Sequence, residues 1–318
     1  MRRPLKYEAP AACSAQPCRD KRGLGPTLWS RFVEDRAALA AFVFILVVLA
    51  LGVLAPILPM PSPNKIALAE KFAAPGLEHL LGTDHLGRDV LSRLVWGIRT
   101  TVFSAVAAMC ATAAVGALWA GIAASGSAGL DRFMMRVARA WMALPSEVMI
   151  LAVVGMLGPG LENVVFACVA AKWPWHARMI RSALARLSQA GYIVFAKLSG
   201  ASGTRILLSH LAPNVLGDFF VFATIDTAAV ILTVATLSFL GLGVAAPAAE
   251  WGMMLAEAKN VMTIHPGLML APGLAILAVS AAFGFAGDGL ESALRPKEPG
   301  RIVPDNHTAE TPQPEREA

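Results

Sequence analysis

Residues 37–58 read AALAAFVFILVVLALGVLAPIL, an apolar run that no charged residue interrupts. A helix needs about 20 such residues to cross the hydrocarbon core of a bilayer. Charged residues precede the run at 31–36, and Pro59, Pro61 and Pro63 follow it. A cleaved signal peptide begins with a short charged segment, whereas a long polar arm precedes this run. We therefore predict an uncleaved transmembrane helix.

Five further apolar runs follow along the chain. They cover residues 101–124, 140–157, 161–175, 215–244 and 267–287. Only Gly158, Pro159 and Gly160 separate the third span from the fourth, and this combination signals a turn, so these two spans are predicted to form a helical hairpin. The sequence thus predicts an all-α integral membrane protein with about six transmembrane helices.

The composition of the 318 residues agrees with a bilayer environment. Hydrophobic residues make up 56% and charged residues only 15% of the chain, with a mean hydropathy of +0.59, whereas a soluble domain is about 25% charged. This excludes a soluble enzyme. The net charge of +5 does not indicate nucleic acid, because Lys and Arg flank the apolar runs instead of forming one basic stripe. The four cysteines lack metal-ligand or disulfide spacing.

Lys and Arg gather on one side of the predicted membrane. Most of them lie in the arm at 1–36, between the second and third spans, between the fourth and fifth, and after the last. By the positive-inside rule both termini are cytoplasmic. We predict a partly disordered arm at 1–36, a transmembrane domain at 37–294 and a disordered tail at 295–318, because the tail is too polar to bury a core.

The segment at 59–99 is expected to lie outside the membrane. Its residues 82–93 read GTDHLGRDVLSR. Thr83 or Asp84 is a suitable N-cap, and the apolar residues from Leu86 onward recur at helical spacing, so an amphipathic helix is predicted along the outer face. Asp84, Arg88 and Asp89 either bind substrate or form an i, i+4 pairing that stabilises this helix.

The segment at 178–213 is expected to lie inside. Tyr192, Phe195 and Ala196 recur at a helical period. Gly200 is predicted to end that helix, and Ser202 is a suitable cap for a second short helix. Two short helices at an angle should therefore project from the membrane.

These segments resemble a known family. The helix–Gly–helix pattern that Pro213 closes is similar to the cytoplasmic coupling loop, or EAA loop, of ABC importer permeases. The outer signature at 82–93, the stretch LSFLGLG at 237–243, EWGMM at 250–254 and GDGL at 287–290 resemble permeases of the dipeptide/oligopeptide/nickel subfamily. The likeness covers about 28–297. Where relatives carry Glu-Ala-Ala, this chain has Val194-Phe195-Ala196, which weakens the electrostatic part of the coupling contact.

The resemblance implies a type I importer fold in a bacterial inner membrane and a chain without its own ATPase site. No Walker A sequence occurs. The implied partners are a second permease subunit in a heterodimer, two ATP-binding subunits that hold ATP and Mg, and an extracytoplasmic solute-binding protein. The residues implied in ATPase coupling are Tyr192, Phe195, Ala196, Gly200, Ala201, Ser202 and Pro213.

Within the subfamily, the runs at 82–89, 175–182 and 248–252 look most like nickel-importing members, so nickel or a nickel chelate is the expected cargo and di- or oligopeptides are the alternative. Asp226 in the fifth span is the candidate for the translocation path, because a carboxylate in the bilayer is expensive; a helix–helix hydrogen bond is the competing interpretation. A secondary transporter or channel would be built from inverted repeats, which are not apparent here. A membrane enzyme would need several convergent ionisable groups.

Overall fold

A computed structural model describes residues 32–294, so the arm up to residue 31 and the tail from 295 lie outside the described residues. Helices make up the regular structure of the described part, which contains no β-strand beyond one isolated bridge between Thr83 and Asp89. The helices of eight or more residues are α2 (Arg36–Leu54), α3 (Val90–Gly97), α4 (Phe103–Ser125), α5 (Ala128–Trp141), α6 (Ser146–Leu157), α7 (Leu161–Leu187), α8 (Gly191–Leu198), α10 (Ala212–Phe239), α11 (Trp251–Lys259) and α12 (Gly267–Leu294). The shorter ones are η1 (Leu68–Glu70), η2 (Ile98–Val102), α9 (Gly203–Ile206) and η3 (Leu207–Leu211).

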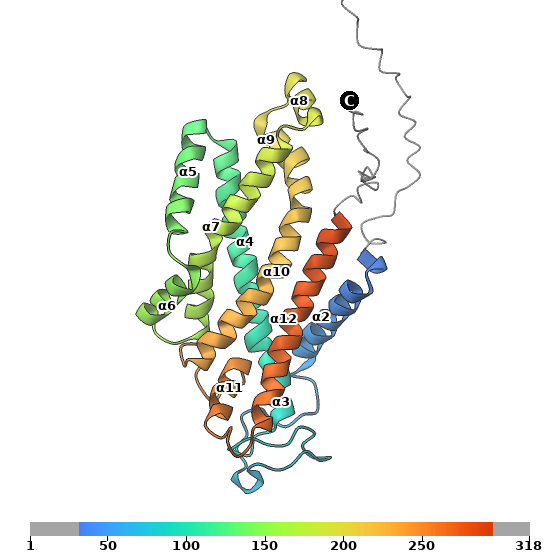
Figure 1. The fold of residues 1–318 in the computed structure, drawn as a ribbon, viewed down its shortest axis with the longest axis vertical. Coiled ribbons are helices and arrows are strands. Elements are labelled where there is room, and N and C mark those ends of the chain that lie inside the picture. The colour runs from blue at the N-terminus through green and yellow to red at the C-terminus, as the bar shows by residue number, and fades with distance from the viewer. Residues whose placement is uncertain (1–31, 295–318) are drawn as a thin grey trace, which may run out of the picture.

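The long helices α2, α4, α7, α10 and α12 run roughly along the longest axis of the molecule (Figure 1). Helix α4 packs against α7, α10 against α12, and α12 against α2. The loop at 55–89, α3 and α11 lie at one end, called the α11 end below. Helices α8 and α9 lie at the opposite end, called the α8 end below. The start of α2 and the end of α12 are directed toward that end but lie nearer the middle of the long axis.

Four stretches of the described chain are long and apolar enough to cross a membrane: Arg36–Leu54, Val90–Ser125, Ser209–Phe239 and Gly267–Leu294. A fifth is obtained if α5 and α6, which bend by 78° at their break, form one span. The expectation of six spans is therefore not met on these criteria. Helix α7, the expected fourth span, is 27 residues long but carries charges along its length, including Lys172, Arg178, Arg181 and Arg186.

Several predicted boundaries are wrong for identifiable reasons. The fourth span was expected to end at Trp175, yet α7 continues to Leu187 in spite of Pro174. Ile180, Ala183 and Leu184 on this extension are buried in a second apolar cluster at the α8 end, which stabilises the added turns. The inner segment expected at 178–213 consequently leaves α7 only after Leu187, and η3 continues into α10 without a break.

The hairpin predicted between the third and fourth spans is present. Gly158 and Gly160 both have positive φ, at 89° and 156°, and reverse the chain between α6 and α7. The third span itself is different from the expected 140–157, because the chain bends between α5 and α6 at residues 142–145. Pro145 lies in this bend, and it favours a break because it lacks an N–H to donate to the preceding turn.

Candidate functional site

The predicted outer helix starts later than expected. Val90 is the first residue of α3, and Asp89 is its N-cap, with the side chain accepting from the Ser92 N–H at 2.6 Å. Asp84 instead closes a loop by accepting from the N–H groups of Leu86 and Arg88 at 2.8 and 2.9 Å. Helix α3 continues through η2 into α4, so it is the start of the second span rather than a separate helix along the surface.

Asp84 and Arg88 form the pairing that the sequence suggested, in a loop rather than a helix. Arg88 Nε donates to Asp84 Oδ2 at 2.6 Å, and Arg88 Nη2 donates to Glu257 Oε2 at 2.6 Å. Arg93 Nη2 reaches the same Glu257 oxygen at 3.0 Å. Both arginine side chains are 1% exposed. These hydrogen bonds connect the outer loop and α3 to α11. They favour a stabilising role for Asp84 and Arg88 over direct substrate binding.

Asp89 has a second partner in the loop. His79 Nδ1 lies 2.9 Å from Asp89 Oδ2, and its Nε2 lies 3.3 Å from Glu70 Oε2. The hydrogen bond to Asp89, together with the nearby Glu70 carboxylate, raises the pKa of His79 above its usual value. A charged His79 therefore stabilises the folded outer loop.

Glu250 is a further buried carboxylate at this end, and it was not among the residues predicted from the sequence to have a role. It caps α11 by accepting from the Met253 N–H at 2.7 Å, and its other oxygen accepts from Thr101 Oγ1 at 2.9 Å. Burial raises the pKa of this carboxyl group. Thr101 belongs to the π-helical turn η2. Its hydrogen bond to Glu250 therefore connects the second span to the start of α11.

The α8–α9 segment has the predicted helix–Gly–helix form. Gly200 has a φ of 80°, a conformation that costs other L-residues about 1–2 kcal/mol. The Ala201 N–H donates to the Ala196 carbonyl at 3.1 Å, which is the long bond of a Schellman motif. The Arg205 N–H donates to Ser202 Oγ at 3.4 Å, as expected of a cap. Pro213 lies in the first turn of α10 and does not close the segment.

Helix α8 has one buried face and one exposed face. Ile193 is fully buried in the apolar cluster that α4, α7 and α10 share. Tyr192 and Phe195 are 48% and 72% exposed, and Leu198 is 81% exposed. An apolar surface of this kind, on a helix that is anchored to three long helices through Ile193 and Ala196, is typical of a docking helix.

Asp226 lies near the middle of the 28-residue α10, about 20 Å from either end at about 1.5 Å per residue. Its Oδ1 accepts from Lys172 Nζ on α7 at 2.7 Å, so the helix–helix bond considered from the sequence is present. Lys172 and His176 were missed as partners. Their spacing of four residues, which places both on one face of α7, was the available signal.

The Lys172–Asp226 pair also lines a cavity of about 370 Å³ between α7, α10 and the α5–α6 turn. Glu147 and His176 line it as well. Charged side chains at mid-membrane depth usually face a bundle interior or an aqueous path rather than lipid. In the described range 32–294, no group of three or more His, Cys, Asp and Glu side chains is arranged to hold a metal ion.

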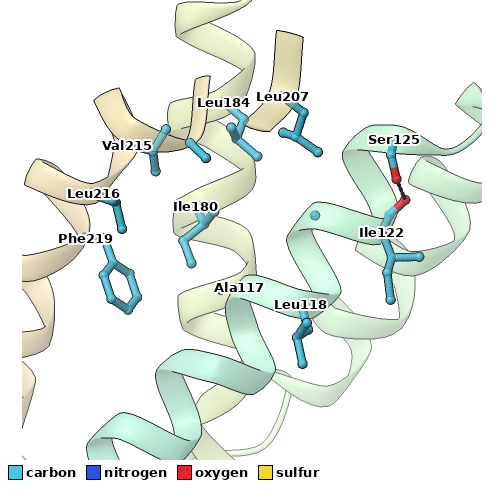
Figure 2. A pocket seen from close by; sticks show the side chains of 12 residues that line it. Ala117, Leu118, Ile122, Ser125, Ile180, Leu184, Leu207, Val215, Leu216 and Phe219 are labelled. Atoms are coloured by element: carbon cyan, nitrogen blue, oxygen red, sulfur yellow. Dashed lines mark hydrogen bonds between the residues drawn. The ribbon is translucent and has the colours of Figure 1, made fainter. Parts of the chain in front are cut away.

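A second cavity, of about 470 Å³, lies nearer the α8 end. Figure 2 shows Leu118 and Ile122 of α4 on one side, Ile180 and Leu184 of α7 behind, and Leu216 and Phe219 of α10 on the other side. Its lining is almost wholly apolar, so a hydrophilic cargo is better matched by the cavity at Asp226.

The model of a known protein family, described as "Binding-protein-dependent transport system inner membrane component", matches residues 112–297, more than half of the chain. The chain is 37% identical to the metal-staphylopine import system permease protein of Staphylococcus aureus, over 84% of this chain and 92% of that protein. It is 38% identical to the nickel transport system permease protein of Escherichia coli, over 83% and 96%.

A putative peptide transport system permease protein of Brucella abortus is 36% identical, over 84% of this chain and 90% of that protein. Among solved structures, the inward-facing MetNI methionine ABC transporter matches with a TM-score of 0.53 at 18% identity, covering 64% of this chain and 97% of that one. That match supports the type I importer fold. On this evidence the chain belongs to the binding-protein-dependent transport family, as a multi-pass inner-membrane permease of the peptide/nickel ABC importers.

Proposed function

We propose that this permease forms half of the translocation path for nickel or a nickel chelate. The observation that carries the proposal is the charged cavity at mid-membrane depth, where Lys172 and Asp226 meet. Two of the similar permeases are named for metal-staphylopine and nickel. A third is named for peptides, and di- or oligopeptides are the alternative cargo.

The chain performs no covalent chemistry in this proposal. A solute-binding protein delivers the cargo at the α11 end, and two ATP-binding subunits close on ATP and Mg at the α8 end. This permease binds no cofactor and contributes no ATPase site. The α8–α9 segment transmits the closing motion, with Tyr192 and Phe195 seated in a groove of the ATPase as a helix-in-groove contact.

The described geometry supports this use of α8. Ile193 fixes α8 to the apolar cluster at the ends of α7 and α10, and these two helices carry the Lys172–Asp226 pair. A displacement of α8 is therefore applied directly to the helices that line the charged cavity. The energy is supplied by the partner subunits.

A second permease subunit is proposed as the other half of the path. Asp226 and Lys172 keep 18% and 12% of their side-chain surface exposed in the single chain, and lipid does not solvate such groups. An unlike permease chain covering α7 and α10 would remove them from lipid and complete the path. In this proposal both termini of the chain lie in the cytoplasm, on the side where Lys and Arg concentrate.

The cargo is tested by measuring cellular nickel with mass spectrometry in cells with and without this gene, at limiting metal, with and without histidine as a chelator. We expect nickel to fall in the deletion strain and to return with the intact gene. Unchanged nickel, together with lost growth on dipeptides as the nitrogen source, would contradict the nickel assignment and support the peptide alternative.

A further inference from the structure

The cavity at Asp226 contains a polar atom that the fold leaves without a partner. His176 is 1% exposed, and its Nε2 makes no hydrogen bond although it is buried. A buried polar atom without a partner is destabilising, because it loses its hydrogen bond to water and gains none from the protein. His176 and Asp226 both line the cavity, and Nε2 lies 3.8 Å from Asp226 Oδ2. A ligand that enters the space beside Asp226 and moves the two side chains apart would supply the missing contact.

The contact of the other ring nitrogen, Nδ1, shows whether Nε2 donates or accepts a hydrogen bond. His176 Nδ1 lies 3.4 Å from the carbonyl oxygen of Lys172, and a carbonyl only accepts, so Nδ1 carries the hydrogen. In the neutral ring Nε2 is then an acceptor. It lies 3.8 Å from Asp226 Oδ2, which is also an acceptor. Two acceptors facing each other across this distance, with no donor between them, form a site for a positively charged group.

Lys172 provides the opposite charge on the same wall. Its ammonium group has three hydrogens, and one of them is directed to Asp226 Oδ1 at 2.7 Å. The others remain available to an anionic group in the cavity. Lys172 and His176 lie one turn apart on α7 and Asp226 faces both from α10, so the cationic and anionic contacts are only a few ångströms apart.

We propose that this cavity is a cargo subsite that recognises small molecules carrying a carboxylate beside a positively charged centre. Lys172 Nζ receives the carboxylate, and His176 Nε2 with Asp226 Oδ2 receives the metal ion or ammonium group. The inference rests on the proposed function and names the class of cargo that its path accepts. A metal ion chelated by an amino acid and a dipeptide both have this chemistry.

The small number of contacts suits transport. A site in a path must bind well enough to admit the cargo and weakly enough to release it. Two ligand atoms from the protein leave the chelator's own bonds to the metal intact. A closed site of four protein ligands, as in structural metal centres, would instead retain the ion.

The test uses the complete importer, with both permeases, the ATPases and the binding protein, in proteoliposomes. ATP-driven uptake of radioactive nickel with histidine and of a labelled dipeptide is measured beside ATP hydrolysis. His176→Gln removes the imidazole without leaving a charge unpaired. We expect uptake to fall at least fivefold while ATP hydrolysis stays within twofold, because the coupling segment is untouched.

A second variant addresses the charged pair. Changing Lys172→Met and Asp226→Asn together removes both charges, since one buried charge alone is strongly destabilising. We expect the same loss of uptake with retained hydrolysis. Asp218→Asn is the matched control, because Asp218 on α10 pairs with Arg186 on α7 at 2.9 Å and lies outside the cavity lining.

The outcomes distinguish failure of the proposed subsite from failure of the proposed nickel cargo. A nickel-specific loss in His176→Gln supports contact of Nε2 with the metal ion, and an equal loss of both cargoes supports contact of Nε2 with the positively charged centre of either cargo. The subsite would be overturned if His176→Gln and the double variant both took up cargo at the level of the unmodified importer. It would also be overturned if uptake and ATP hydrolysis fell together in these variants. If the unmodified importer takes up the dipeptide but not nickel, the proposed cargo is contradicted. The subsite is then tested by the effect of the variants on dipeptide uptake.

Discussion

Gly116 on α4 faces α7 with no room for a side chain. A Cβ at this position would lie 2.6 Å from His176 Cβ and 3.0 Å from the Ala177 nitrogen. Small residues allow membrane helices to approach closely, and overpacking a filled interface costs about 1–3 kcal/mol. We expect Gly116→Ala to lower the unfolding temperature of the purified importer and to disturb the His176 side of the cavity.

Gly121 on the same helix is the matched control. A Cβ there would have no atom within 4 Å, and Ala favours a helix over Gly by about 1 kcal/mol. Gly121→Ala should leave the unfolding temperature unchanged or raise it. Equal effects of the two substitutions, measured by thermal unfolding in one detergent, would show that α4 and α7 are not in close contact at Gly116.

His79 makes the outer loop sensitive to pH. Its pKa is raised by the hydrogen bond to Asp89 and by Glu70, so the folded loop binds the proton more tightly than the unfolded chain. The stabilisation is complete below the ordinary value of about 6.5 and is lost as pH rises through the raised folded value. Amide hydrogen exchange in residues 67–89, corrected for intrinsic rates, should be faster at pH 8.5 than at pH 6.

The His79→Gln variant supplies the control for that measurement. It removes the titrating group, so the corrected exchange rates should become independent of pH over this range. The capping bond from Asp89 to the Ser92 N–H and the backbone bonds to the His79 carbonyl do not depend on the imidazole. A pH dependence that persists in His79→Gln would assign the effect to another group.

The turn between α8 and α9 depends on the conformation of one residue. Gly200 has a φ of 80° and open space around its Cβ position, so a substitution strains the backbone without a steric clash. We expect Gly200→Val to reduce ATP-driven uptake at least tenfold while the protein stays in the membrane. Gly203→Val is the control, because Gly203 also has open space and no positive φ. Equal uptake by both variants would remove the coupling role of this turn.

The membrane-spanning helices were predictable because apolar length is a local property. The run at 37–58 and the Gly158–Gly160 turn were both recognisable without tertiary contacts. Helix α7 was predicted too short because its last turns are amphipathic, and their apolar face becomes a packing surface only when α4, α8 and α10 are present. Thr83 or Asp84 was predicted to cap the outer helix. Asp84 instead accepts from N–H groups within a loop, and Arg88 of that loop is held by Glu257 of α11.

The site was predictable only in part for the same reason. Asp226 was identifiable as an isolated carboxylate in an apolar run. Its partner Lys172 is 54 residues away in the chain, and no local pattern connects the two. The stretch at 192–210 was interpretable as two helices joined at Gly200, whereas the burial of Ile193 on one face of α8 required the folded arrangement of the neighbouring helices.

The chain has two distinct ends, and its orientation in the membrane can be tested on them. Leu77 in the outer loop is 99% exposed, and Leu198 on α8 is 81% exposed. Figure 1 places the outer loop at the α11 end and α8 at the other. The proposed orientation puts the α8 end in the cytoplasm, because Lys and Arg concentrate in the segments on that side.

Leu77→Cys and Leu198→Cys form a matched pair in a background without Cys13, Cys18, Cys110 and Cys168. A membrane-impermeant maleimide should label Leu77→Cys in spheroplasts with an intact inner membrane, and Leu198→Cys only after that membrane is opened. Both positions are exposed leucines, so a difference in labelling reports the side of the membrane rather than burial. The reversed pattern would place α8 on the side away from ATP, and the coupling role of the α8–α9 segment would fail together with the orientation.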